Sequence, residues 1–243
     1  MNALPNNEVK FAWDELPARF PGFRDPGRWL PLLQHHQRLI EASAGRVRVT
    51  AVAPDEAVRR HYAESLELLR IVRAHTPAGP LVDVGSGGGF PGLAIAAVEP
   101  ETPVHLVEPL QKRARFLQDA AAELGLANVQ VHAMRAEDAG RGPLRNSAAV
   151  VTARAVAELR ELLEYTAPLA APGALLAFPK GSALPGELEA ARHALSELGC
   201  EFLASEPMRP EISPTVSVAL IRKAAPTPAA YPRRAGIPHK RPL

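Results

Sequence analysis

The chain has 243 residues, of which 47% are hydrophobic and 22% charged, with a formal net charge of +2. This length and composition provide a real hydrophobic core, and no apolar run approaches the 18 residues that a membrane-spanning helix needs. The single cysteine, Cys200, excludes a disulfide framework and a cysteine-based zinc site. We therefore expect a cytoplasmic protein without a metal, and the first residues do not resemble a secretion signal.

The N-terminal third of the chain divides into two segments. Residues 1–26 are rich in Pro, Asn and Gly and are expected to be loosely ordered. Residues 27–78 show two apolar faces with helical spacing, one through Trp29 and the other through Tyr62, which predicts a helical cap outside any sheet. We interpret His61, on the second face, as a packing residue that holds this cap in place rather than as a catalytic group.

The most informative stretch is LVDVGSGGGFPG, residues 81–92. An apolar strand runs into an acidic residue and a glycine-rich turn, and a helix begins near Leu93, which is typical of nucleoside-binding or phosphate-binding sites. A carboxylate from Asp83 at the strand tip would repel a pyrophosphate and attract the sulfonium and ammonium groups of S-adenosylmethionine. At roughly 4 Å and an effective dielectric of about 20, such an interaction is on the order of 4 kcal/mol before desolvation. Asp83 therefore favours a methyl donor over NAD.

The rest of the chain alternates strands and helices up to about residue 222. Strands are predicted over residues 104–107, 129–133, 148–152, 174–178, 200–204 and 216–222, and helices over 112–124, 158–170 and 186–198. This alternation predicts an α/β, Rossmann-like fold whose parallel sheet is buried on both faces. The ligand crevice then lies at the carboxyl ends of the strands, where Asp83, Glu108, Glu137 and Lys180 fall.

Two of these strand tips suggest contacts with a nucleoside. Glu108 ends the second strand, 23 residues after Gly85, where a carboxylate can accept hydrogen bonds from both ribose hydroxyls. That role is shared by NAD sites and methyltransferases, so it indicates a ribose without identifying the ligand. Ala136 and Glu137, after the third strand, are expected beside the adenine.

Charge is unevenly distributed along the chain. Residues 81–221 contain 11 Lys and Arg against 17 Asp and Glu, whereas residues 222–243 contain six Lys and Arg and no acid. Five prolines between Pro226 and Pro242 are expected to keep the tail extended. It is either a solvated terminus or an arm that docks on phosphates. The candidate RNA contacts are Lys112, Arg113, Lys180, Arg233, Arg234, Lys240 and Arg241.

Several motifs together resemble one family. The segments DVGSGGGFPG, LVEPLQKRARFL, RAE, TARAVA, PKG and YPRRAGIPHKRPL are similar to those of the glucose-inhibited division protein B family, bacterial guanine-N7 methyltransferases of 16S rRNA. The resemblance implies a class I methyltransferase fold with a mostly parallel seven-stranded sheet, S-adenosyl-L-methionine as donor, and N7 of one guanine as acceptor. Carried over by motif, the donor contacts are Gly85, Phe90, Glu108, Pro109, Leu110, Ala136, Glu137 and Arg154, which we add to Asp83.

The sequence departs from the family pattern at a few positions. The family's Asn-Leu-Thr is Arg48, Val49 and Thr50 here, its Asp before Ser-Leu is Glu64, and its acid-Ser at the second strand tip is Glu108–Pro109. These changes affect the hydrogen bonding of the cap and the reach of the ribose carboxylate.

The reaction expected of such a site needs little acid–base chemistry. Thr152 to Ala155 occupy the place where adenine-amine methyltransferases carry an Asn/Asp-Pro-Pro-aromatic turn, and Cys200 is far along the chain from any cytosine-directed nucleophile position. Guanine N7 has a free lone pair and loses no proton on attack, so in-line placement and exclusion of water suffice. No residue is assigned as catalytic.

The sequence thus predicts a methyltransferase domain over residues 79–223, a basic tail over 224–243 and a monomer that acts on the 16S rRNA of the small ribosomal subunit. Two alternatives remain open. A methyltransferase for a small molecule or a protein would bind the donor but show no salt-sensitive affinity for rRNA. A non-enzymatic RNA-binding module would bind RNA and leave the donor unchanged.

Overall fold

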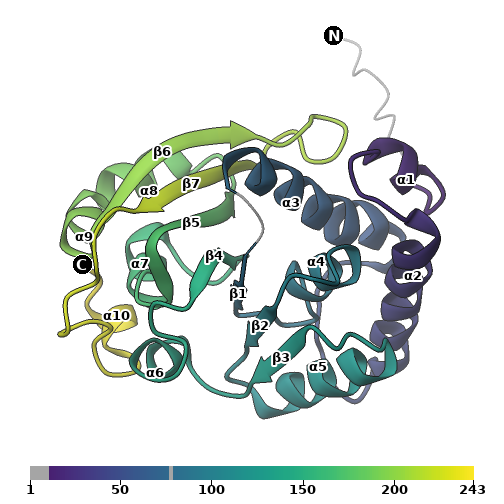
Figure 1. Cartoon of the computed structure of the whole chain (residues 1–243), viewed down its shortest axis with the longest axis horizontal. Coiled ribbons are helices and arrows are strands. Elements are labelled where there is room, and N and C mark those ends of the chain that lie inside the picture. Colours follow the sequence, from purple (N-terminus) through teal and green to yellow (C-terminus); the bar gives the residue numbers. More distant parts are fainter. Residues whose placement is uncertain (1–10, 77–78) are drawn as a thin grey trace, which may run out of the picture.

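The computed structural model describes residues 11–76 and 79–243. At its centre lies a seven-stranded sheet with the order β3-β2-β1-β4-β5-β7-β6 (Figure 1). The strands are β1 Leu81–Val84, β2 Val104–Val107, β3 Val129–His132, β4 Ala148–Ala153, β5 Ala170–Lys180, β6 Cys200–Pro207 and β7 Ser217–Lys223. Strands β1 to β5 pair in parallel, and β7 runs antiparallel to both β5 and β6. This arrangement confirms the expected α/β fold with a mostly parallel seven-stranded sheet.

Helices cover both faces of this sheet. Those preceding β1 are α1 Glu15–Arg19, α2 Pro26–Ser43, the 3-10 turn η1 Pro54–Glu56, the π-helix η2 Val58–Ala63 and α3 Glu64–His75. Those that follow it are α4 Gly92–Val98, α5 Gln111–Glu123, α6 Ala136–Arg141, α7 Leu159–Thr166, α8 Leu184–Ala190, α9 Arg192–Glu197 and α10 Ile237–Lys240. No helix in the described residues has the length and apolar character needed to cross a membrane.

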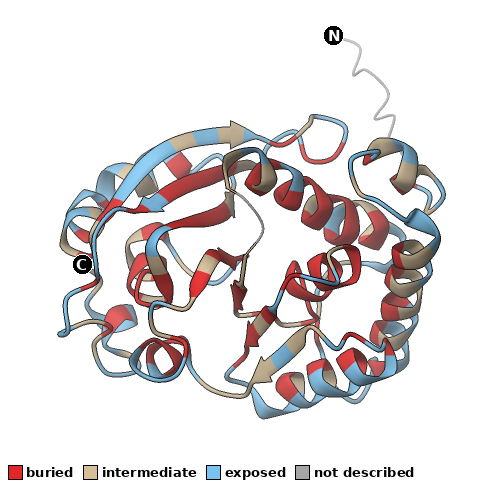
Figure 2. Ribbon diagram, viewed as in Figure 1, coloured by how far each residue is buried: buried red, intermediate tan, exposed pale blue. Residues whose placement is uncertain are grey.

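Alternate strand residues enter two separate hydrophobic clusters. Leu81 and Val150 belong to the cluster that includes helices α2 to α5, whereas Val82 and Val151 belong to the one that includes α6 to α9. Because successive side chains of a strand point to opposite faces, a sheet covered on both sides reads as a continuous apolar run. Figure 2 shows the resulting buried centre under a partly exposed outer layer.

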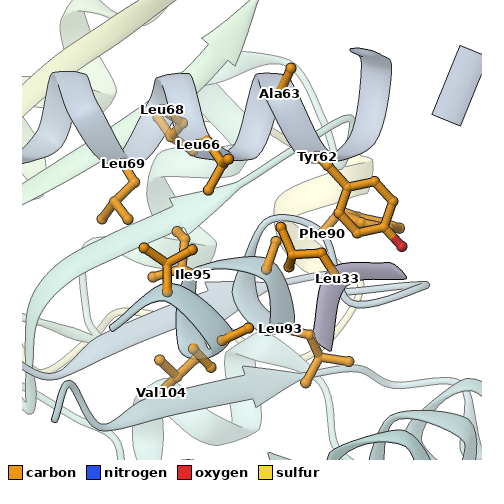
Figure 3. Packing of buried hydrophobic residues seen from close by; sticks show 14 of the residues in the cluster. Leu33, Tyr62, Ala63, Leu66, Leu68, Leu69, Phe90, Leu93, Ile95 and Val104 are labelled. Atoms are coloured by element: carbon orange, nitrogen blue, oxygen red, sulfur yellow. The ribbon is translucent and has the colours of Figure 1, made fainter. Parts of the chain in front are cut away.

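The cap packs against the helix that follows the glycine-rich turn. Leu66 and Leu69 of α3 lie over Ile95 of α4, and Tyr62 lies beside Phe90 of the turn, as the close-up shows (Figure 3). Leu66, Leu69 and Ile95 are each at most 1% exposed. One face of the sheet and the cap therefore share one core.

Two local expectations were wrong. Residues 11–26, predicted to be loosely ordered, contain α1 and bury Phe11, Leu16 and Phe20 against the cap core; residues 1–10 lie outside the described residues. The single helix predicted over residues 186–198 is two helices, because Ala191 adopts φ −90° and ψ 0°.

The basic tail also differs from the expected extended arm, because it folds back onto α6 and α7. The Arg233 guanidinium donates to both oxygens of Glu164, a carboxylate that is completely buried, at distances of 2.5–3.1 Å. Arg145 donates to the carbonyls of Thr227 and Tyr231. A buried carboxylate requires a charged or hydrogen-bonded partner, so the tail is part of the folded domain.

Candidate functional site

The glycine-rich turn after β1 has a conformation that side chains would prevent. Gly85, Gly87 and Gly89 all have positive φ, at 71°, 55° and 94°. A Cβ atom at Gly85 would lie 2.6 Å from Cγ2 of Val156 in the loop after β4. Glycine is therefore required at position 85 both for backbone conformation and for close approach of the two loops.

Asp83 supports this turn from below instead of forming its rim. Its side chain is fully buried, and its two carboxylate oxygens accept hydrogen bonds from Gly92 N at 3.2 Å and the Thr152 hydroxyl at 3.1 Å. Burial raises the pKa of Asp83 to about 6. The expectation of a carboxylate exposed to a ligand at the strand tip is thus corrected, because Asp83 joins the turn to α4 and β4.

Glu108, at the tip of β2, connects the second strand to the turn. Its Oε2 accepts from Gly87 N at 3.0 Å, and its Oε1 accepts from Leu110 N at 2.9 Å. The residue is 2% exposed. These two contacts fix the position of the Glu108 carboxylate. Because a carboxylate can accept about four hydrogen bonds, lone pairs remain for a hydroxyl group of a ligand.

The cap contacts the glycine turn through His36 on α2. Its Nε2 lies 2.8 Å from the Gly88 carbonyl oxygen, which can only accept, so this nitrogen carries the proton. Burial lowers the pKa of His36 to about 4. Its Nδ1 is then an acceptor, and the Tyr62 hydroxyl donates to it at 3.3 Å.

His61, on the π-helix η2, is held between the turn and the loop after β4. Its ring stacks on Phe90, and its Nδ1 accepts from Arg154 Nη2 at 2.9 Å. Since arginine only donates, Nε2 carries the proton and donates to the Thr50 hydroxyl at 2.7 Å. Burial, with the neighbouring charge of Arg154, lowers the pKa of His61 to about 3. These contacts agree with the interpretation of His61 as a packing residue.

Arg154 follows β4 and is fixed from several sides. Besides His61, its guanidinium contacts the Arg60 carbonyl at 2.8 Å and Glu64 Oε2 at 3.4 Å. Its side chain retains 19% exposure. It lies 5.5 Å from the centre of the Phe90 ring, within the range of a cation–π interaction.

Beside the turn lies a cavity of about 890 Å³, near the upper end for small-molecule sites. Its walls come from the cap, the glycine turn, the start of α5, the loop after β4 and the β6–β7 loop. The polar or charged side chains among them are Arg48, Thr50, Arg59, Arg60, His61, Glu64, Ser86, Arg113, Arg154, Ser213 and Thr215. No cluster of three or more His, Cys, Asp or Glu suited to a metal occurs in the described residues.

The structure distributes the expected donor contacts along one edge of the sheet. Gly85, Phe90 and Arg154 line the cavity. Pro109 and Leu110 follow β2 and are exposed, and Ala136 begins α6 after β3. Since β1 to β4 are parallel neighbours, all these tips lie at the same edge of the sheet.

Glu137 lies at that edge but is already engaged by the tail. It is 4% exposed, and its Oε1 accepts from Gly236 N at 3.0 Å.

The expected RNA contacts separate into paired and exposed cations. Lys180 donates to Glu187 at 2.6 Å and to the Ala157 carbonyl at 2.7 Å, and Arg233 is paired with buried Glu164. Both therefore already have partners within the protein. Lys112, Arg234, Lys240 and Arg241 are exposed, and half-buried Arg113 lines the cavity.

Several residues of the site were missed by sequence reasoning. His36 reaches Gly88 across 52 positions of the chain, and Ser213 and Thr215 enter from the β6–β7 loop. No local pattern marks these residues, since each becomes part of the site only through tertiary packing.

The strand order with its reversed β7, and the glycine turn at the tip of β1, define the protein's class as that of the Rossmann-like methyltransferase folds. Among solved structures, an S-adenosylmethionine-dependent methyltransferase from Aquifex aeolicus matches with a TM-score of 0.52 and 14% identity, over 76% of this chain and 97% of the other. A mutant form of MtNAS matches with a TM-score of 0.55 and 15% identity, over 81% and 72%. At such identities the likeness concerns the fold.

Sequence comparison identifies the family. The model of rRNA small subunit methyltransferase G matches residues 31–208. A relative of that name from Roseiflexus castenholzii is 42% identical over 91% of this chain and 95% of its own length, and one from Chloroflexus aggregans is 44% identical over 82% and 83%. The chain belongs to the rRNA small subunit methyltransferase G family, which confirms the resemblance found in the sequence.

Proposed function

We propose that this protein transfers a methyl group from S-adenosyl-L-methionine to N7 of a guanine in the 16S rRNA of the small ribosomal subunit. The observation that carries the proposal is the glycine turn, pinned by Glu108 and open to a large cavity roofed by the cap, in a member of this family.

The residues at the sheet edge fit the donor. Gly85 lines the cavity, and Glu108 has lone pairs left for ribose hydroxyls. We assign Arg154 to the donor carboxylate, and the segments Pro109–Leu110 and Ala136–Glu137 to the adenosine. Bound there, the donor supplies an electrophilic methyl group next to a positively charged sulfur.

The acceptor needs positioning instead of a base. His61 is not available as a base at neutral pH. Its Nδ1 already accepts a hydrogen bond from Arg154, and its Nε2–H donates to the Thr50 hydroxyl. Guanine N7 loses no proton when it attacks, so a site without a free base is sufficient. The cap and the β6–β7 loop would hold the base and exclude water from the reacting atoms.

The RNA backbone would bind along cations beside the cavity mouth. We define the α5 basic strip as Arg46, Arg48, Lys112, Arg113 and Arg115. The first turn of α5 contains Lys112 and Arg113 and no acid. Cations at a helix N-terminus are unfavourable by several tenths of a kcal/mol. A phosphate backbone would compensate for this arrangement. Of the tail cations, exposed Arg234, Lys240 and Arg241 remain candidates.

The direct test is incubation of the protein with methyl-labelled donor and small-subunit rRNA, free or in 30S particles. Large-subunit rRNA is the matched control. Label in the small-subunit RNA alone supports the proposal. Donor binding without transfer to either RNA would favour a small-molecule or protein substrate. Size-exclusion chromatography with light scattering tests the accompanying expectation of a monomer.

A further inference from the structure

Glu64 is an acid of the cavity wall to which neither donor binding nor phosphate binding gives a role. It begins α3, directly after the π-helix that carries His61, and its side chain is 14% exposed. It lines both the main cavity and a neighbouring one of about 260 Å³ at the ends of β4 and β5. Its carboxylate therefore faces the space in which a base would lie.

The contacts of Glu64 leave part of its hydrogen-bonding capacity free. Among the described residues, the carboxylate is approached by Arg154 Nη1 at 3.4 Å and by the Ser213 hydroxyl. Burial raises the pKa of Glu64, while Arg154, Arg60 and Arg59 counteract that rise. A carboxylate with about four acceptor sites can satisfy two more donors from a ligand.

Arg154 stands beside this carboxylate as a rigid donor. Its guanidinium is held by the Arg60 carbonyl and by Nδ1 of His61, and His61 is in turn fixed by Thr50 and Phe90. The contacts with Arg60, Glu64 and His61 use three of the five N–H groups of Arg154. Two remain, one for the carboxylate of the methyl donor and one for a base. A carboxylate next to an immobilised guanidinium presents acceptors and donors in adjacent positions. This pattern is complementary to a base edge with two donors next to one acceptor.

We propose that Glu64 and Arg154 read the Watson–Crick edge of the target guanine: Glu64 accepts from N1–H and the 2-amino group, and Arg154 donates to O6. The inference rests on the proposed function and adds its base specificity. N7 lies on the other edge of the base and remains free for methyl transfer. Adenine has an acceptor at N1 and an amino donor at C6. Its N1 would face the Glu64 carboxylate and its amino group would face the Arg154 guanidinium, so neither hydrogen bond could form.

The test compares three RNA oligonucleotides that contain the mapped target site with guanine, inosine or adenine at the target position. Inosine keeps O6, N1–H and N7 but lacks the 2-amino group. Affinities are measured with S-adenosylhomocysteine present, so that a variant without turnover still gives a result. We expect the wild-type protein to prefer guanine over inosine about tenfold, the usual effect of one lost hydrogen bond to a charged group.

Glu64→Gln should lower this preference to about twofold or less, because an amide cannot accept both donors. Glu64→Asp, which keeps the carboxylate, should restore most of it, and Glu201→Gln, an exposed change on β6, is the matched control. Thermal unfolding and donor affinity establish that each variant is folded. An unchanged preference in Glu64→Gln would overturn the assignment while wild-type rRNA methylation stands. Absence of methylation by the wild-type protein would instead remove the proposed function itself.

Discussion

The imidazole ring of His61 lies flat on the phenyl ring of Phe90, with centroids 4.1 Å apart and planes 8° apart. His61 belongs to the cap and Phe90 to the glycine turn, so this stack joins the two parts of the molecule that enclose the cavity. His36 makes a second connection through Gly88. The cap therefore takes part in the shape of the turn. Both histidines are neutral, because Nδ1 of His36 accepts from Tyr62 and Nδ1 of His61 accepts from Arg154.

The first prediction concerns stability at low pH. Burial lowers the pKa of His36 to about 4 and that of His61 to about 3, whereas histidines of the unfolded chain titrate near 6.5. The stability that they contribute is present above pH 6.5 and is lost as the pH falls toward 4. Asp83 opposes this trend, because its pKa of about 6 in the folded protein makes the fold take up a proton in the same range. Together, these three groups should lower the free energy of unfolding by about 2 kcal/mol between pH 7 and 5.

Urea unfolding at the two pH values measures this loss. His61→Gln should remove about half of the histidine contribution, while His193→Gln, an exposed histidine of α9, should leave it unchanged. Equal pH dependence in His61→Gln and wild type would show that His61 is not buried as a neutral ring.

The second prediction concerns donor affinity. Glu108→Ala removes the acceptor that holds Gly87 N and Leu110 N, together with the expected ribose contacts. Donor binding should weaken by about 1–3 kcal/mol, since hydrogen bonds to a charged group are lost. Isothermal titration calorimetry measures this change, with Glu101→Ala in the exposed loop before β2 as the control. Wild-type affinity in Glu108→Ala would contradict the ribose assignment.

The third prediction concerns the tail. Arg233→Ala leaves the buried Glu164 carboxylate without its cation and should lower the free energy of unfolding by about 3 kcal/mol. Arg234→Ala, at an exposed neighbour, should change it by less than about 0.5 kcal/mol. The double variant Arg233→Ala/Glu164→Leu should regain most of the stability, because no charge remains buried. Similar denaturation midpoints for Arg233→Ala and Arg234→Ala would mean that the Arg233–Glu164 pair does not anchor the tail.

The fourth prediction concerns RNA binding by the α5 basic strip. Replacing Lys112 and Arg115 by alanine should weaken rRNA binding and reduce the slope of log K against log salt by about 0.7 for each phosphate that the protein no longer neutralises. Arg192→Ala, an exposed cation of α9, should leave the slope unchanged. Filter binding over a range of salt concentrations provides the measurement. A wild-type slope in the double variant would show that the RNA backbone does not contact Lys112 and Arg115.

The fold could be predicted from the sequence because its signals are local. Continuous apolar strands, the glycine turn and the acid at the tip of β2 are written within short segments, and the sheet edge follows from parallel pairing. The π-helix η2 could not be predicted, since no local pattern marks it; its Tyr62 and His61 pack against Phe90, which belongs to the glycine turn.

Two of the positions that were misjudged share one cause. Asp83 and Arg233 are charged residues whose partners lie far away in the sequence, at Thr152 and Glu164. Composition indicates that a charge exists but gives no information on which buried group it meets. A strand-tip carboxylate and a basic tail therefore looked available to ligands when the fold had already engaged them.

The central claim, methyl transfer to guanine N7 of small-subunit rRNA, is tested most directly by locating the methyl group. Small-subunit rRNA would be incubated with the protein and methyl-labelled donor, and digested to nucleosides for mass spectrometry. We expect the label to appear as 7-methylguanosine at one position and to decrease in Glu108→Ala. Label on any other atom or base, or none in rRNA while the donor is bound, would contradict it.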